Sequence, residues 1–293
     1  APVVVVKELE NKNFIGGAAI VASHIKELGA KCYFISVVGN DDNAKQIKNE
    51  LEKRGIIQDL LEDSSRPTTF KKRYLVGNQK LFRVSRLEDH SINEKLEKII
   101  LNRLEELAPN VDGIVISDFS YGVITPKIIN KIISLKIKYR LSIFGDLQCS
   151  SQVGSITKFK NFSLLCPNER EARLSLMDKE SGLETLSQNL ISKTKTKRLI
   201  MKLGNDGFIA YDRDKNDRVI SQSFPSLSVN PLDVAGAGDS LLAVMAIGLS
   251  SGQPMMHTSA LACCRAAQAV EQMGNTPVSS QALKKSIKSI FKF

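Results

Sequence analysis

The chain has 293 residues, 42% of them hydrophobic, which is enough for one large domain, alone or with a small appendage. Its 41 basic and 31 acidic residues leave a net charge of +10 that is spread along the chain, and no basic stretch is interleaved with aromatic residues. A nucleic-acid platform is therefore not expected, nor is a membrane span, because the longest apolar run, residues 241–249, is too short to cross a bilayer.

The five cysteines form an odd set without C-x-x-C spacing, which indicates buried thiols in a reducing compartment and therefore a cytoplasmic protein. The first residues, APVVVVKELE, place no basic leader before the apolar run, which argues against a signal peptide. Because Ala1 is not an initiator Met, we expect either a processed chain or a natural start further upstream.

A glycine pair opens the first predicted helix. Residues 14–30, FIGGAAIVASHIKELGA, place Gly16 and Gly17 before an Ala-rich segment with helical spacing. Small residues at a helix start allow close approach by a ligand, and they equally allow tight packing of the helix on a sheet. Residues 31–39 then predict a buried strand, and residues 41–55 predict a helix.

A β-hairpin is predicted next. In residues 70–89, FKKRYLVGNQKLFRVSRLED, polar and apolar residues alternate on both sides of Gly77 and Asn78. We place the limits of the hairpin at residues 66–90. Such an insertion in an α/β chain serves as a lid or as a dimer contact, and plain extension of the main sheet is the other interpretation.

Short β-branched runs alternate with helical segments through the rest of the chain. This alternation predicts an α/β fold with a doubly wound, mostly parallel sheet and helices on both faces, formed by one domain over residues 1–293. The predicted strands include residues 113–118, 141–146 and 198–204, and the predicted helices include residues 126–138, 241–249 and 260–273.

Polar residues follow two of these strands. Asn168 and Glu171 come after the apolar run before Pro167, where they either form a capping box or organise a hydrated Mg²⁺ near phosphates. Further on, Lys202 ends a strand, and residues 204–207, GNDG, form either a tight turn or a backbone surface on which a nucleotide lies.

The most informative stretch is LDVAGAGDSLLA, residues 232–243. The loop of Gly236, Ala237 and Gly238 has little or no side chain, so its N–H groups and the following helix N-terminus can hold an anion beyond the strand ends. Asp239 would then accept a proton from a hydroxyl nucleophile, or would only stabilise the helix as a first-turn acid. The standard phosphate loops, G-x-x-x-x-G-K-[ST] and G-x-G-x-x-G, are absent.

The order of these motifs resembles the ribokinase, or pfkB, family of carbohydrate kinases over essentially the whole chain. The order is GGAA, N-x-x-E, L-G-x-x-G and a late GAGD preceded by Asp233, the last being the most specific. The stretches APVVVVKE, RPTTFKKRYLVGNQKLFRV and VISDFSYGVIT are most similar to kinases of D-glycero-β-D-manno-heptose 7-phosphate in lipopolysaccharide precursor synthesis. The resemblance implies a ribokinase-like fold, ATP and Mg²⁺ as cofactors, and phosphorylation of heptose 7-phosphate at O1 to the 1,7-bisphosphate.

The resemblance also assigns roles to residues. Asp239 resembles the base that deprotonates the sugar hydroxyl, and the loop before it resembles the anion hole. The remaining assignments are the anion hole at Gly236, Ala237 and Gly238, Mg²⁺ through water and phosphate at Asn168 and Glu171, the nucleotide at Lys202, Gly204 and Gly207, and the sugar at Gly16 and Gly17.

Three features depart from the family. Ile20 stands where the family usually has Asn, and residues 146–148 read Asp-Leu-Gln where heptose kinases commonly have Asp-Pro-Lys. The family also begins with a strand that carries a sugar-binding Asp, and no such strand precedes Ala1 in this sequence. We therefore expect a first strand upstream of Ala1 in the same sheet, and a sugar pocket near Gly16 that Ile20 makes less polar than usual.

We expect an ATP-dependent sugar kinase, with heptose 7-phosphate as the preferred acceptor. The alternatives are another pfkB-type sugar kinase and a non-catalytic sugar- or nucleotide-binding domain. The expected partners are the sugar phosphate, a second copy bound through the hairpin lid, and a nucleotidyltransferase to which heptose kinases are often fused or paired.

Overall fold

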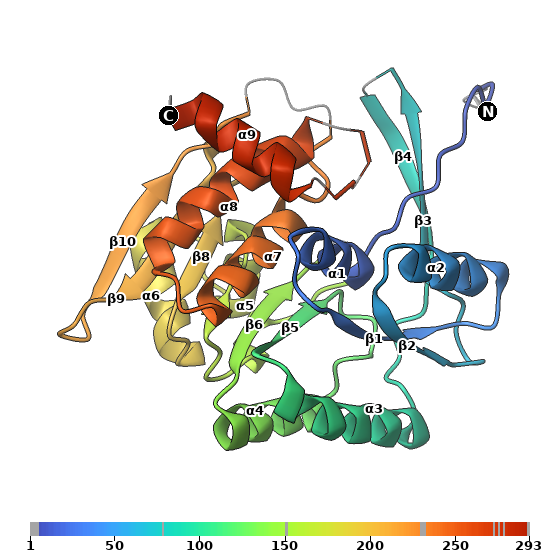
Figure 1. The fold of residues 1–293 in the computed structure, drawn as a ribbon, viewed down its shortest axis with the longest axis horizontal. Helices are drawn as coiled ribbons and strands as arrows, with labels where there is room; N and C mark the ends of the chain where they lie inside the picture. Colours follow the sequence, from blue (N-terminus) through green and yellow to red (C-terminus); the bar gives the residue numbers. More distant parts are fainter. Residues whose placement is uncertain are drawn as a thin grey trace.

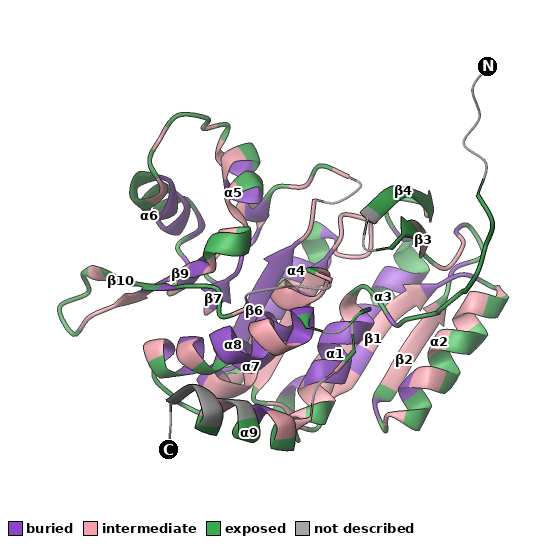
Figure 2. Ribbon diagram, turned by 90° about the horizontal axis from the view of Figure 1, so that it is seen from above, coloured by how far each residue is buried: buried purple, intermediate pink, exposed green. Residues whose placement is uncertain are grey.

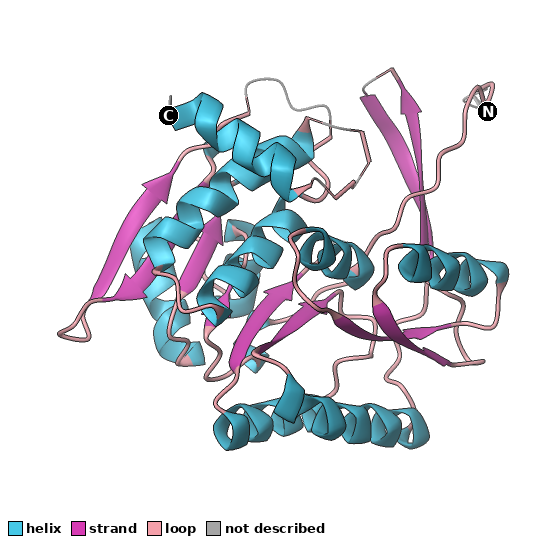
Figure 3. Cartoon of the chain, viewed as in Figure 1, coloured by secondary structure: helices cyan, strands magenta, loops and turns pink. Residues whose placement is uncertain are grey.

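The computed structural model describes residues 6–77, 79–149, 152–228, 233–271, 273–274, 276–277 and 279–291. Helices and strands alternate along most of the chain, as the hydrophobic pattern predicts (Figures 1 and 3). In chain order they are α1 (Ala18–Glu27), β1 (Tyr33–Val38), α2 (Asp42–Lys53), β2 (Ile57–Glu62), β3 (Phe70–Val76), β4 (Gln79–Arg86), α3 (Glu94–Leu107), β5 (Gly113–Asp118), α4 (Pro126–Tyr139), β6 (Ser142–Leu147), β7 (Leu164–Leu165), α5 (Glu169–Leu176), α6 (Leu183–Thr194), β8 (Leu199–Lys202), β9 (Phe208–Arg213), β10 (Val219–Phe224), α7 (Ala237–Ser250), α8 (Met255–Val270) and α9 (Ser280–Phe291).

The main sheet has the strand order β10-β9-β8-β7-β6-β5. Strands β5 to β8 run parallel, and β9 and β10 add an antiparallel edge. Strand β8 is buried at Leu199, Ile200 and Met201, as is typical of a parallel strand covered on both faces. The predicted mostly parallel sheet is confirmed.

Helices cover both faces of this sheet (Figure 2). One apolar cluster joins the strands to α4 and α6 and includes Ile132 and Leu190. A second cluster, on the other face, joins them to α1, α7 and α8 and includes Val21, Leu242 and Ala262. The predicted doubly wound architecture, with helices on both faces, is therefore confirmed.

Strands β1 and β2 form a separate parallel pair. Within the described residues, β1 pairs only with β2 and β5 pairs on one side only, with β6. Every residue of β1 and of β5 lines a cleft of about 1810 Å³, to which α1 and α7 contribute Val21 and Ala246, and α3 and α4 contribute Leu104 and Ile128. The cleft thus lies in the sheet layer, bounded by two strand edges and by helices from both faces.

Strands β3 and β4 form the predicted hairpin as a two-stranded antiparallel sheet of their own. Plain extension of the main sheet is therefore wrong, although Asn78 of the predicted turn lies outside the described residues. One face of the hairpin is turned to the cleft, because Lys71 Nζ lies 5.2 Å from the ring centroids of both Phe119 and Tyr121. This placement suits a lid.

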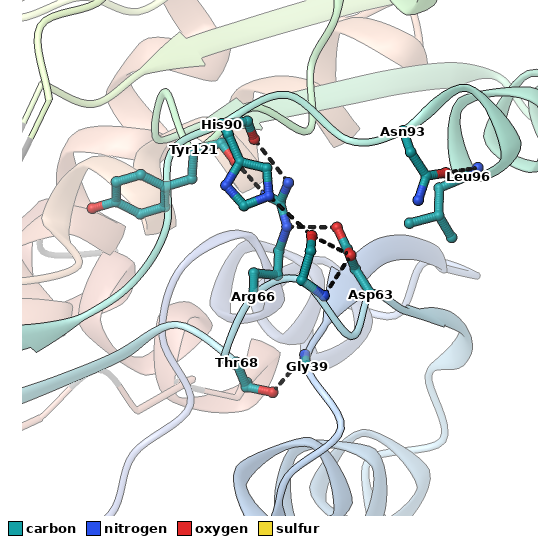
Figure 4. A network of polar contacts seen from close by, with 9 residues as sticks. Gly39, Asp63, Arg66, Thr68, His90, Asn93, Leu96 and Tyr121 are labelled. Atoms are coloured by element: carbon teal, nitrogen blue, oxygen red, sulfur yellow. Dashed lines mark hydrogen bonds and ion pairs between the residues drawn. The ribbon is translucent and has the colours of Figure 1, made fainter.

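A buried network fixes the root of the hairpin (Figure 4). Arg66 Nε donates to Asp63 Oδ2 at 2.7 Å, and Arg66 Nη1 and Nη2 donate to the carbonyl oxygens of Tyr121 and His90, each at 2.8 Å. Ser65 Oγ donates to the other Asp63 oxygen at 2.6 Å. Because buried charges are costly unless they are fully bonded, these contacts tie the hairpin root to the segment after β4 and the loop after β5.

The predicted helix over residues 260–273 has different limits. Helix α8 runs from Met255 to Val270, with Pro254 at its N-cap. Its first turns contain Thr258 and Ser259, which are buried although they are polar. The hydroxyl of Thr258 bonds to the carbonyl of Pro254, so the apolar pattern begins later than the helix does.

Candidate active site

The loop before α7 leaves a helix N-terminus without a side chain over it. Gly236 is the N-cap, with φ 95° and ψ −7°, a left-handed conformation that favours glycine. No side chain of the described residues caps the first turn, which Ala237 and Gly238 begin. The N–H groups of a first helical turn and the helix dipole together favour an anion at this position.

Asp239 lies in the first turn of α7, and only 7% of it is exposed. It is not the helix cap, because Gly236 holds that position. Its Oδ1 atom accepts a hydrogen bond from Gln148 Nε2 at 2.9 Å. A carboxylate held by a hydrogen bond beside an anion-favouring helix end is compatible with the general base of a phosphoryl transfer.

Lys202, the last residue of β8, lies beside the same loop. Its Nζ atom pairs with Asp146 Oδ1 at 2.8 Å, and a Cβ atom on Gly238 would lie only 3.3 Å from that Nζ. Because β6 and β8 are parallel, their carboxyl ends meet at one edge of the sheet and bring Asp146 and Lys202 together. The ammonium group of Lys202 thus lies next to the backbone of the first turn of α7.

Lys202, Asp146 and Glu171 form a charged cluster in which each charge affects the others. Burial opposes the charge on Lys202, but Asp146 and Glu171 outweigh burial and raise the pKa of Lys202 above its ordinary value. Burial raises the pKa of the Glu171 carboxyl, and the nearby Asp146 raises it further, although Lys202 acts in the opposite direction. Asp146 Oδ2 is buried and has no partner among the described residues.

Asn168 and Glu171 form the capping box that the sequence left as one of two possibilities. Asn168 Oδ1 accepts from the Glu171 amide, and Glu171 Oε2 accepts from the Asn168 amide, each at 2.8 Å. Glu171 Oε1 accepts from the amide of Cys149 at 3.3 Å. Both carboxylate oxygens therefore face backbone donors at the edge of the cluster, where a hydrated ion would contact them through water.

The turn between β8 and β9 has two glycines with different roles. Gly207 has φ 85°, and a Cβ atom there would lie 2.1 Å from the carbonyl oxygen of Phe224, so packing alone requires glycine. Gly204 has φ 64° and nothing within 4 Å of its Cβ position. Open backbone at Gly204 is compatible with a flat ligand, and it lies two residues after Lys202.

Gly16 and Gly17 line the cleft at the start of α1. A Cβ atom on Gly16 would meet nothing within 4 Å, and one on Gly17 would lie 3.8 Å from Phe119 Cε2. Tight packing on the sheet therefore does not explain the pair. Lys71 of the hairpin adds a cation to the same part of the cleft.

Ile20 does not face this pocket, and the expectation that it makes the pocket less polar is wrong. Its side chain is fully buried and packs with Ile15, Phe34, Leu51 and Ile56. This apolar cluster lies between α1, α2 and the β1–β2 pair, and Ile20 is not among the residues that line the cleft. Ile20 is a core residue in this chain.

The residues present fit a nucleotide with Mg²⁺. Lys202 and the start of α7 offer positive charge to phosphates, and Asp146 Oδ2 is a buried acceptor without a partner in the described residues. The part of the chain that the structure describes has no group of three or more His, Cys, Asp or Glu side chains placed to hold a metal. Magnesium suits such a site, because it commonly takes most ligands from water and phosphate oxygens.

Sequence reasoning missed three contributors. The sequence showed Gln148 only as a departure from the family, and it showed Lys71 and Phe119 only as parts of longer stretches. The contacts of Gln148 with Asp239 and of Lys71 with Phe119 join segments that are distant in the sequence. The position of Gln148 just after a parallel strand is the one local signal that could have indicated a site residue.

In the described residues, no helix has both the length and the apolar character to cross a bilayer.

The chain matches a family model described as pfkB family carbohydrate kinase over residues 1–282. The bifunctional protein HldE of Helicobacter hepaticus is 30% identical over 281 residues, which cover 94% of this chain and 56% of that protein. HldE of Helicobacter acinonychis is 30% identical over 278 residues, covering 94% of this chain and 58% of that protein. The chain thus spans little more than half the length of these relatives.

Solved structures show the same fold at lower identity. Arabidopsis thaliana ribokinase, complexed with ribose and ATP, has a TM-score of 0.75 at 19% identity and covers 97% of this chain and 91% of that one. Phosphofructokinase-2 from Escherichia coli, in complex with potassium, has a TM-score of 0.74 at 17% identity and covers 94% of this chain and 87% of that one. Both support a ribokinase-like fold.

Proposed function

The chain belongs to the pfkB family of carbohydrate kinases, and from this premise we propose that it transfers the γ-phosphoryl group of ATP to a hydroxyl of a sugar phosphate. The observation that carries the proposal is the buried Asp239 beside the uncapped N-terminus of α7, with Lys202 behind the loop. This arrangement offers a base for the acceptor and positive charge for the phosphoryl group.

In the proposed step, Asp239 accepts the proton of the acceptor hydroxyl as its oxygen attacks the γ-phosphorus. The new phosphorus–oxygen bond forms while the bond to the β–γ bridging oxygen breaks, and ADP leaves with the electron pair. The N–H groups of Gly236, Ala237 and Gly238 hold the charge on the transferred group. The protein thus contributes position and charge rather than a covalent intermediate.

ATP and Mg²⁺ are the proposed cofactors. Lys202 and the backbone at Gly204 and Gly207 would hold the nucleotide, and Asn168 and Glu171 would orient water on the ion. Mg²⁺ would supply positive charge that offsets the negative charge of the phosphates. The capping box supports this role only by placing the Glu171 carboxylate at the edge of the charged cluster.

The proposed acceptor is D-glycero-β-D-manno-heptose 7-phosphate, phosphorylated at O1 to the 1,7-bisphosphate. The support is the similarity to HldE proteins, and the identity of 30% leaves another sugar phosphate as the second candidate. Gly16 and Gly17 give the sugar room beside Phe119, and Lys71 supplies a cation for a phosphate group already on the acceptor. A sugar without phosphate would not use that cation.

We also propose that the cleft between β1 and β5 receives one further strand from upstream of Ala1, and that this strand brings an acidic side chain to the sugar. The support is that both strands present an edge without a partner in the described residues, and that the cleft of about 1810 Å³ lies between helices from both faces. A strand edge that presents N–H and C=O groups without a partner is a template for pairing with another strand.

Two partners complete the proposal. A second copy would bind the outer face of the hairpin, where Phe70, Phe82 and Val84 are exposed and the rings of Tyr74 and Phe82 stack at 4.5 Å. A nucleotidyltransferase, fused or separate, would use the product, as the bifunctional relatives suggest. The compartment that supplies ATP and sugar phosphates for this reaction is the cytoplasm.

The test is ADP release by the full-length gene product with ATP and Mg²⁺ against a panel of sugars and sugar phosphates. The panel contains heptose 7-phosphate, fructose 6-phosphate, ribose and the unphosphorylated heptose. The proposal expects the highest kcat/KM with heptose 7-phosphate and little turnover with the unphosphorylated heptose. Equal turnover with and without the acceptor phosphate would contradict it.

A further inference from the structure

The tip of the hairpin contacts the segment that leads into α7. Lys80 Nζ on β4 pairs with Asp233 Oδ1 at 2.8 Å, although 153 positions separate the two residues. The Lys80 side chain is 43% exposed and that of Asp233 is 15% exposed, so the pair lies at the rim of the cleft that both residues line.

Asp233 also shapes the loop after it. Its Oδ1 atom accepts the amide of Ala235 at 3.1 Å, and its own amide donates to the carbonyl of Val270 at 3.2 Å. Burial opposes the charge on Asp233, but the hydrogen bonds from Lys80 and Ala235 outweigh it and hold the pKa of this carboxyl below its ordinary value. Asp233, the ion-pair partner of Lys80, therefore also stabilises the turn that leads to Gly236.

Lys80 belongs to the face of the hairpin that is turned to the cleft. It lies opposite Leu75 in the strand register, and side chains on that face of β3 include Lys71, which reaches Phe119. Lys72 lies on the other face and pairs with Glu8 at 3.3 Å. The hairpin is thus held at its root by Arg66 and at its tip by Lys80.

We propose that the Lys80–Asp233 pair latches the closed hairpin to the loop that begins the anion hole, so that Lys80 is a positioning residue for the nucleotide phosphates. This inference rests on the proposed kinase function and adds to it a coupling between lid closure and the shape of residues 233–238. When the hairpin opens, Asp233 loses its cation and the turn before Gly236 loses its external support.

The coupling predicts a moderate effect on ATP use and little effect on global stability. An exposed ion pair contributes up to about 1 kcal/mol, which converts to about a fivefold change in the closed population. Lys80→Ala should therefore raise the KM for ATP about fivefold at low salt, with a melting temperature near that of the parent. The difference should shrink as ionic strength rises, because the pair is partly exposed.

The experiment is a double-mutant cycle of Lys80→Ala and Asp233→Asn in the full-length protein. Lys72→Ala is the matched control, because it removes an ion-paired lysine from the opposite face of the same hairpin. Lys80→Arg should restore the parent's KM. We expect the KM for ATP of the double variant to be no higher than that of the more impaired single variant, because both substitutions remove the same ion pair.

A second readout does not depend on turnover. Hydrogen exchange of the β3 and β4 amides, with a non-hydrolysable ATP analogue bound, should be faster in Lys80→Ala than in Lys72→Ala. Equal exchange rates in Lys80→Ala and Lys72→Ala would overturn the latch. So would a double variant in which the effects of Lys80→Ala and Asp233→Asn on the KM for ATP multiply. If the parent has no sugar-dependent turnover, the kinase proposal fails, and analogue binding together with exchange still tests the latch.

Discussion

The phosphate side and the sugar side of the candidate site are built in different ways. On the phosphate side, Asp146, Glu171 and Asp239 are at most 7% exposed, and Lys202 is bonded to Asp146. On the sugar side, the open Gly16 position and the hairpin border a cleft of about 1810 Å³. Under the proposed function, the buried charge cluster would perform the transfer, while the hairpin and the proposed upstream strand would complete the acceptor pocket.

The largest effect is expected from removing the base. Asp239→Asn keeps the size of the side chain and one acceptor for Gln148, but it removes the group that takes the proton. Sugar-dependent turnover should fall by about 10²–10⁴-fold, while analogue binding and melting temperature stay near the parent's values.

Asp42→Asn is the matched control for that variant, because Asp42 is also a first-turn acid, on α2. It should leave turnover unchanged. Full sugar-dependent turnover in Asp239→Asn would show that Asp239 only stabilises its helix. It would also contradict the assignment of phosphoryl transfer to the phosphate side of the site.

The next effect concerns the backbone of the anion hole. A Cβ atom on Gly238 would lie 3.3 Å from Lys202 Nζ, so Gly238→Val places two further carbons against the ammonium and the phosphate path. We expect turnover to fall by about 10²–10³-fold, the loss usual for a disturbed anion hole, together with weaker binding of the ATP analogue. Steady-state kinetics and calorimetry measure the two losses.

Gly182→Ala serves as the control for Gly238→Val, since Gly182 has nothing within 4 Å of its Cβ position. It should behave as the parent does. Normal analogue binding in Gly238→Val would mean that phosphates do not approach this loop.

Glu171→Gln separates magnesium organisation from helix capping. If Glu171 orients water on Mg²⁺, the half-saturating Mg²⁺ concentration should rise about 10–100-fold, as for other groups that orient metal ligands. If it only caps α5, Mg²⁺ dependence should not change and stability alone should fall.

The same variant predicts a pH dependence of stability. Burial raises the pKa of Glu171 above the ordinary 4.5, so the folded protein holds this proton more tightly than the unfolded chain does. This carboxyl therefore favours the fold least at neutral pH, where it is ionised in the unfolded chain. The melting temperature of Glu171→Gln relative to the parent should rise from about pH 4 to pH 7, and a falling difference would contradict the raised pKa.

The smallest effect is expected at Gln148. Its amide orients Asp239 at 2.9 Å, and one such hydrogen bond is worth about 1 kcal/mol, so Gln148→Ala should lower kcat about three- to tenfold. The KM for ATP should hardly change, because Gln148 contacts the base and not the phosphate loop. Gln188→Ala, which removes an exposed amide bonded to Glu184 on α6, is the control.

Local patterns predicted the phosphate side better than the sugar side. The GAGD loop, the capping box at Asn168 and the turn after Lys202 are short motifs whose backbone geometry depends on neighbouring residues, and the structure places them at one edge of the sheet. The pairings Asp146–Lys202 and Gln148–Asp239 link segments 56 and 91 positions apart, so no local pattern could predict them.

The sugar side shows why a family pattern can mislead. Ile20 was expected in the pocket because of its place in a motif, yet the helix turns it into the core with Leu51 and Ile56. Strand β2, with the sequence IQDLLE, was not predicted because its polar and apolar residues do not alternate regularly. Its parallel pairing with β1 supplies the structure that the local pattern does not specify.

The central claim, that this site phosphorylates the anomeric hydroxyl of a heptose phosphate, has one most direct test. The full-length protein is incubated with ATP, Mg²⁺ and heptose 7-phosphate, and ³¹P NMR follows the products. The account predicts one new sugar phosphate signal, coupled to the anomeric proton, that grows in step with ADP and does not form with Asp239→Asn. ADP formation without a new sugar phosphate signal, or phosphate at another carbon, would contradict it.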